Sequence, residues 1–315
     1  FVLLPVLFYV VLGSVMSSGT ALVAAFVATF LFSNAACALF AWSDVPFLCF
    51  SLMSLAAVFR IVQTRGRAGA WFVLLAGGLA GYTFLLRYIG VTLISAVLLG
   101  GVAMFALRII PVRTLLRIAI LYASGVALVV VPFLVRNVLL FGTLQPYRMP
   151  PSLTPWGDNV RDYFQGLAQM FFANPSFAAG MMVLVAGLLV GGVLLAGSWA
   201  RREPAAFVSG VVLWMYFVFN STFLVVYKTI FFGPESINER YLIQVSWILV
   251  GGLVGAIGAA LRALNDRALL DTKTVTAFLL FVFVLAQVFP AVDFYSGQRD
   301  VKELARTIEH YSPLV

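Results

Sequence analysis

The sequence is poor in charge and in the residues that most often bind metals or act in catalysis. Only 10% of its 315 residues are charged, the first of them is Asp44, and 63% are hydrophobic. Soluble domains carry about 25% charged residues, so this composition excludes an ordinary soluble protein. The single histidine, His310, leaves almost nothing for His-rich metal sites or for a Ser-His-Asp triad. A Mg²⁺ or Mn²⁺ site made of carboxylates stays open.

Cysteine is also scarce. Cys37 and Cys49 lie in or beside apolar runs, and we interpret both as buried thiols that act as small hydrophobic side chains. The chain begins without methionine inside the apolar run 1–16, and the lack of a basic region before this run argues against a signal peptide. We therefore expect a fragment that lacks sequence at one or both ends.

Long apolar runs separated by charged or turn residues dominate the sequence. A run of about 20 apolar residues can cross the hydrocarbon core of a bilayer. The sequence therefore predicts an all-α, polytopic membrane helix bundle, with a transmembrane module over 1–292 and the start of a soluble extracytoplasmic segment over 293–315. The predicted spans, about ten, are 1–16, 21–42, 46–59, 70–86, 88–107, 118–135, 177–199, 206–227, 241–261 and 275–292.

Basic residues are unevenly divided between the two sides on which alternating spans place the loops. The side with 17–20, 60–69, 108–117, 200–205 and 262–274 carries eleven basic and three acidic residues, and thus the whole net charge of +8. Short cytoplasmic loops are enriched in Lys and Arg, so we predict that this side is cytoplasmic. In this interpretation the arginines determine topology, and no nucleic-acid partner is implied.

The longest predicted loop, 136–176, lies on the extracytoplasmic side. Within it, 158–172 repeats apolar side chains at helical spacing and has polar side chains on the opposite face. Asp158 can cap the start of such a helix. An amphipathic helix beside a membrane normally lies in the interface. Two roles stay open: a helix that only covers the bundle, and a lid over a groove where an amphiphilic substrate enters.

Charged and aromatic residues gather at the extracytoplasmic ends of the predicted spans, whereas none of the spans has a charged residue in its middle. Arginine binds phosphate through its rigid donor fork, and a nearby carboxylate can accept a proton from a hydroxyl. Such residues suit sugar transfer from a polyprenyl-phosphate carrier, because positioned cations stabilise the leaving phosphate. Pairing of the arginines with lipid head groups or acidic residues is the other interpretation. The candidate site residues are Asp44, Arg87, Tyr88, Arg136, Asn137, Arg240 and Tyr241.

Four stretches carry a family resemblance. They are SDVPFLCF around Asp44, GGLAGYTFLLRY around Arg87, VPFLVRNVLLFG around Arg136, and ERYLI around Arg240. In this order they resemble the C superfamily of multispanning membrane glycosyltransferases, and most of all its protein O-mannosyltransferase and aminoarabinose-transferase branch. The resemblance extends over about residues 21–300.

The resemblance implies a helical membrane bundle with short extracytoplasmic helices, a sugar donor linked to polyprenyl phosphate, and an acceptor glycan, lipid or protein. It also implies a principal catalytic carboxylate in the first extracytoplasmic loop, which we expect to lie upstream of residue 1. Asp44 is then a second acidic position that orients the acceptor, binds a metal or pairs with an outer arginine. The implied location is the bacterial inner membrane, among membrane lipids.

Two alternatives from other functional classes stay open. A transporter or flippase for lipid-linked sugars would be favoured by an internal inverted repeat, and none is visible in the sequence. A non-enzymatic scaffold or an O-antigen-polymerase-like membrane protein is the other.

Overall fold

The structure is a computed structural model that describes residues 3–29, 44–144, 152, 154–171, 192, 203–231 and 239–265. Every secondary-structure element assigned in these ranges is a helix, which agrees with the predicted all-α class. Several predictions fall outside the described residues, namely the spans 177–199 and 275–292, the segment 293–315, Cys37 and His310.

Four helices in the described part of the chain are long and apolar enough to cross a membrane. They are α4 (Asp44–Gln63), the 3-10 turn η1 (Tyr88–Gly90) continued by α6 (Val91–Ala106), α7 (Val112–Phe141) and α10 (Pro204–Ile230). Shorter apolar helices are α2 (Ser18–Thr29), α5 (Ala70–Leu86) and the Leu242–Gly258 part of α11 (Glu239–Asn265). These are the lengths and compositions of a helical membrane protein, while the total of about ten spans stays a prediction.

The predicted helix boundaries are accurate in some places and wrong in two. The predicted span 70–86 matches α5 residue for residue. The predicted span 1–16 is wrong in length, because α1 covers only Leu4–Leu12, whereas the predicted break before the next span is present as the turn that precedes α2. The predicted helix end after residue 135 is also wrong, because α7 continues to Phe141. Gly142 ends it with a φ of 67°, a left-handed conformation that glycine adopts without strain.

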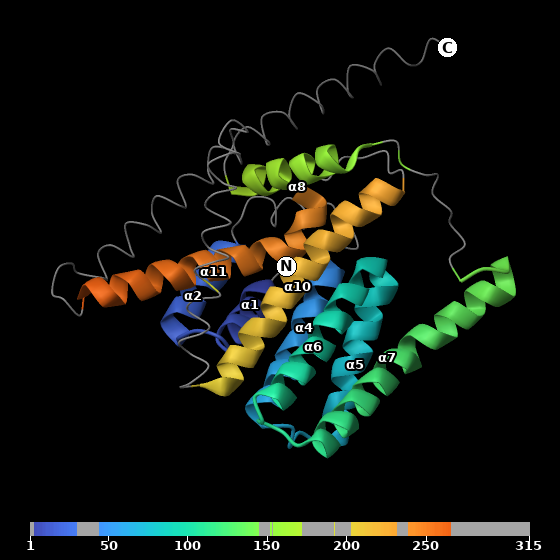
Figure 1. Cartoon of the computed structure of the whole chain (residues 1–315), viewed down its shortest axis with the longest axis horizontal. Helices are drawn as coiled ribbons and strands as arrows, with labels where there is room; N and C mark the ends of the chain where they lie inside the picture. Colours follow the sequence, from blue (N-terminus) through green and yellow to red (C-terminus); the bar gives the residue numbers. More distant parts are fainter. Residues whose placement is uncertain are drawn as a thin grey trace, which may run out of the picture.

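The helices α4, α5, α6 and α7 alternate in direction along one bundle, with α10 beside them and α11 across them (Figure 1). The α4–α5 turn at 64–69 and the α6–α7 turn at 107–111 lie at the same end of the bundle, and α8 lies across the opposite end. This arrangement agrees with the predicted alternation, which placed 60–69 and 108–117 on one side and 136–176 on the other. Which of the two sides is cytoplasmic stays a prediction.

The helix predicted at 158–172 is present as α8 (Trp156–Phe171), which packs against α10 and α11. Tyr163 and Leu167 from the predicted apolar stripe are buried, whereas Arg161 on the polar face is exposed. The helix starts two residues before Asp158. Asp158 therefore lies in the first turn, where its charge favours the helix dipole, and the prediction that it precedes the helix as a cap is wrong.

Glycine allows α5 and α7 to approach at backbone distance. A Cβ atom on Gly77 would overlap the carbonyl oxygen of Tyr122, and one on Gly125 would overlap that of Leu74. Gly77 and Gly81 are four residues apart, the spacing that lets membrane helices pack closely through small side chains. The contact between α5 and α7 therefore depends on the absence of side chains at these positions.

The sidedness can be tested with single cysteines at Gly69 and Gly157, because a Cβ atom at either position would meet nothing within 4 Å. Cys37 and Cys49 are first replaced by alanine. A membrane-impermeant maleimide added to intact cells should label Gly157→Cys, and should label Gly69→Cys only after permeabilisation. Labelling of the Gly69 variant alone in intact cells would contradict the predicted topology.

The glycine contact predicts that Gly77→Ala destabilises the protein, because the added methyl group must push α7 away from α5. Overpacking of this kind costs about 1–3 kcal/mol, and it should lower the thermal melting temperature of the purified protein. Gly78→Ala is the matched control, since a Cβ atom there would meet nothing closer than 3.9 Å. Equal melting temperatures for the two variants would show that the contact is not tight.

Candidate functional site

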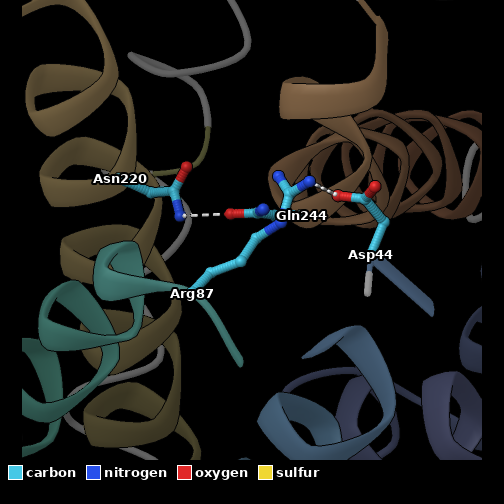
Figure 2. Close-up of polar contacts among 4 residues, drawn as sticks. All are labelled: Asp44, Arg87, Asn220 and Gln244. Carbon is cyan, nitrogen blue, oxygen red and sulfur yellow. Dashed lines mark hydrogen bonds and ion pairs between the residues drawn. The ribbon is translucent and has the colours of Figure 1, made fainter. Parts of the chain in front are cut away.

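A buried ion pair joins α4 to the turn after α5. An Nη atom of Arg87 lies 2.7 Å from a carboxylate oxygen of Asp44. Asp44 has no exposed surface, and the Arg87 side chain is 16% exposed. Figure 2 shows the Arg87 side chain extended toward Asp44. The two candidates are therefore in contact, and of the roles expected for Asp44, pairing with an outer arginine is the one present in the structure.

The local chain conformation explains how Arg87 reaches Asp44. Arg87 follows the last residue of α5 in an extended conformation, and η1 begins directly after it. Gly90 makes this turn possible, because a Cβ atom there would lie 2.6 Å from the backbone nitrogen of Phe84. Asp44 opens α4, where a carboxylate also interacts favourably with the helix dipole.

A second polar pair joins α10 to α11. The Nδ2 atom of Asn220 donates a hydrogen bond of 3.2 Å to Oε1 of Gln244, and both residues are fully buried. Figure 2 includes both pairs, and their helices α4, α10 and α11 pack against one another. The other amide atoms, Oδ1 of Asn220 and Nε2 of Gln244, are buried and have no hydrogen-bond partner among the described residues.

Two further buried hydroxyls belong to the same packing layer between α4 and α10. The hydroxyl of Tyr216 lies near that of Ser51, yet neither makes a well-formed hydrogen bond. Both residues have no exposed surface. The site thus contains several buried polar atoms that are left unsatisfied, and such atoms are rare in folded proteins.

Two hydrogen bonds join α8 to the C-terminal half of α10. The Tyr163 hydroxyl forms a hydrogen bond with the Ser221 hydroxyl. Nδ2 of Asn159 donates a hydrogen bond of 3.1 Å to Oγ1 of Thr229. Burial raises the pKa of the Tyr163 phenol above its ordinary value, so this hydroxyl stays protonated and can donate. α8 therefore covers the end of the bundle through specific polar contacts as well as its apolar face.

The remaining candidate residues are spread over three elements. Tyr88 is exposed in η1 and packs edge-on against Phe84. Asn137 is buried in α7, and its Nδ2 atom donates to the carbonyl oxygen of Leu144 at 3.1 Å. This hydrogen bond holds the chain after the helix, which is a structural role.

Arg136 lies on the exposed surface of α7, one residue before Asn137. Within the described residues it makes no ion pair. Arg240 and Tyr241 belong to the first turn of α11, and their side chains lie outside the described part. The structure thus joins Asp44 to Arg87, and the convergence of the other arginines on this pair stays a prediction.

Metal binding was left open by the sequence. Among the described residues, no three His, Cys, Asp or Glu side chains group closely enough to hold a metal ion. Whether the protein depends on Mg²⁺ or Mn²⁺ stays untested.

Sequence reasoning missed Gln244, Tyr216 and Ser51. Asn220 was visible as a polar residue in an apolar helix, and Gln244 in YLIQVSWIL carries the same signal. Polar side chains on the buried face of a membrane helix usually mark helix contacts or functional sites. The pairing itself could not be foreseen, because it depends on how α10 and α11 cross.

The buried ion pair predicts strong coupling between Asp44 and Arg87. Removing one partner of a buried pair typically costs 3–5 kcal/mol, because the other charge is left uncompensated. Asp44→Ala and Arg87→Ala should each lower stability to unfolding in mixed micelles, and the double variant should lose clearly less than the sum.

The exposed pair of Asp158 and Arg161, 3.3 Å apart, is the control for this double-mutant cycle. Exposed pairs contribute at most about 1 kcal/mol, so alanine at these two positions should have little effect. Additive losses at Asp44 and Arg87 would show that the two charges do not interact.

Comparisons with known proteins give no match. No family model matches the chain, and neither a curated protein nor a solved structure is similar to it. A function for this protein therefore has to be argued from the chemistry of its own residues.

Proposed function

We propose that the protein transfers a sugar from a polyprenyl-phosphate donor to an acceptor hydroxyl at the extracytoplasmic face of a bacterial inner membrane. The buried pair of Asp44 and Arg87 carries this proposal. It lies at the ends of α4 and α5 that face the α8 end of the bundle. Burying two charges gives a bundle no net stability over apolar packing of similar volume, and ionisable groups inside membrane proteins usually serve function.

Arg87 is the group suited to the phosphate of the carrier. A guanidinium has five N–H donors in a planar fork and can hold a carboxylate and a phosphate together. The polyprenyl chain would lie among the apolar helices while its phosphate reaches the interface. Asp44 is buried against Arg87, so in this proposal it positions the guanidinium rather than removing a proton.

The phosphate needs a second cation in addition to Arg87. Asp44 and Arg87 together are electrically neutral, and a neutral pair attracts an anion only weakly. Two candidates from the sequence remain, Arg136 on the surface of α7 and Arg240 in the first turn of α11. The buried Lys228 in the last turn of α10 is a third, and it was not among the candidate site residues.

The proposed reaction is a displacement at the anomeric carbon of the sugar. The acceptor oxygen forms the new bond to this carbon, and the bond from the carbon to the phosphate oxygen breaks. The electron pair and its negative charge pass to the phosphate, where the arginine stabilises them. The proton of the acceptor hydroxyl passes to a carboxylate other than Asp44, which acts as the general base.

A transporter or flippase for lipid-linked sugars is the second candidate. The hydrogen-bonded amides of Asn220 and Gln244 favour it, because transporters bind polar substrates between helices within the membrane. The two functions differ in outcome: the enzyme forms a new glycosidic product in detergent solution, whereas the transporter only moves the lipid across a sealed bilayer.

Replacement of Arg87 by lysine tests the proposed function. Lys keeps the charge opposite Asp44 but loses the planar fork. A charge-assisted phosphate contact contributes about 1.5–3 kcal/mol, so Arg87→Lys should lower sugar transfer from undecaprenyl-phosphate sugars roughly 10- to 100-fold. Arg113→Lys, an exposed arginine at the opposite end of the bundle, is the control and should react like wild type. Full activity of the Arg87 variant would refute the phosphate contact.

A further inference from the structure

Within the described part of the chain, four buried side chains beneath the ion pair have polar atoms that make no hydrogen bond of good geometry. These atoms are Oδ1 of Asn220, Nε2 of Gln244 and the hydroxyls of Ser51 and Tyr216. All four residues have no exposed surface. A buried polar atom that makes no hydrogen bond loses its hydration without compensation, so apolar side chains at these positions would give a more stable bundle. Helix packing alone therefore does not explain them.

The four residues lie below Asp44 as two pairs, one deeper than the other. Ser51 follows Asp44 by seven residues on α4, which places it about 10 Å further into the bundle. The Tyr216 hydroxyl lies near Ser51. Asn220 is one helical turn beyond Tyr216 toward the α8 end of α10, and it bonds to Gln244. The Asn220–Gln244 pair thus lies between the Ser51–Tyr216 level and the ion pair.

The chemistry of the unsatisfied atoms defines the ligand they could hold. The Asn220 oxygen can only accept, the Gln244 nitrogen can only donate, and the two hydroxyls can do both. None of the four side chains carries a charge, so they do not suit an ionic group. A prenyl chain has no hydrogen-bonding group to offer. Neighbouring hydroxyl groups, each of which donates and accepts, match this mixed set.

We propose that Ser51, Tyr216, Asn220 and Gln244 form a binding site for the polyhydroxylated sugar of the lipid-linked substrate. This inference rests on the proposed function, since it takes the phosphate of the same lipid to lie at Arg87. The sugar hydroxyls satisfy the four open atoms, and the site thereby distinguishes a carrier that bears a sugar from a bare carrier. Loss of one such hydrogen bond weakens binding of the sugar-bearing lipid and leaves binding of the bare lipid unchanged.

The test compares undecaprenyl phosphate with mannosyl- and glucosyl-phosphoryl-undecaprenol, bound to the full chain and measured by native mass spectrometry. Tyr216→Phe removes one open hydroxyl and keeps the ring. It should lower the affinity for the preferred sugar-bearing lipid roughly five- to tenfold, as expected for the loss of one hydrogen bond. The affinity for the bare lipid should not change. Gln244→Leu should have the same selective effect.

Tyr122→Phe is the matched control, because Tyr122 is another buried phenol without a hydrogen-bond partner and lies on α7 outside the proposed site. It should bind both lipids like wild type. Equal affinity of wild type for the bare and sugar-bearing lipids, or equal weakening of both by Tyr216→Phe, would overturn the sugar site. Failure of wild type to bind any of the lipids would instead overturn the proposed function.

Discussion

The requirement that a buried carboxylate meet a cation governs the α8 end of this bundle. Asp44 has no exposed surface, so the chain must bring Arg87 to it across the contact between α4 and α5. Gly90 permits the tight turn that gives Arg87 its position, and the adjoining helices α10 and α11 enclose the region from the other side. Low exposure strengthens the electrostatic attraction of the pair, and the neighbouring amides of Asn220 and Gln244 are equally shielded from bulk solvent.

Much of the fold could be predicted because apolar periodicity and breaks report directly on helices. The span 70–86 ends at Arg87, where charge and the following glycine interrupt the helix, and its bounds are correct. The α8 stripe was equally readable, since its apolar and polar faces are sharply separated. The helix end near residue 135 was misplaced because Arg136 was interpreted as a stop. A long basic side chain on the exposed face of a membrane helix can extend toward the interface and need not end it.

The candidate site was only partly predictable. Asp44 and Arg87 could be selected because charges are rare in this chain, and their separation of 43 positions gave no sign that they touch. Gln244, Tyr216 and Ser51 look like ordinary residues of apolar helices. Their importance arises from depth and from the crossing of α4, α10 and α11, which sequence periodicity does not contain. Conversely, Asn137 drew attention beside Arg136, while its side chain holds the chain after α7.

The two hydrogen bonds of α8 have a mechanical consequence. Asn159 bonds to Thr229 and Tyr163 to Ser221, so the order of partners runs in opposite directions along α8 and α10. One attachment would act as a pivot about which α8 could swing. Two attachments fix its direction. A rotation of α8 on the bundle would therefore have to break one of these hydrogen bonds first.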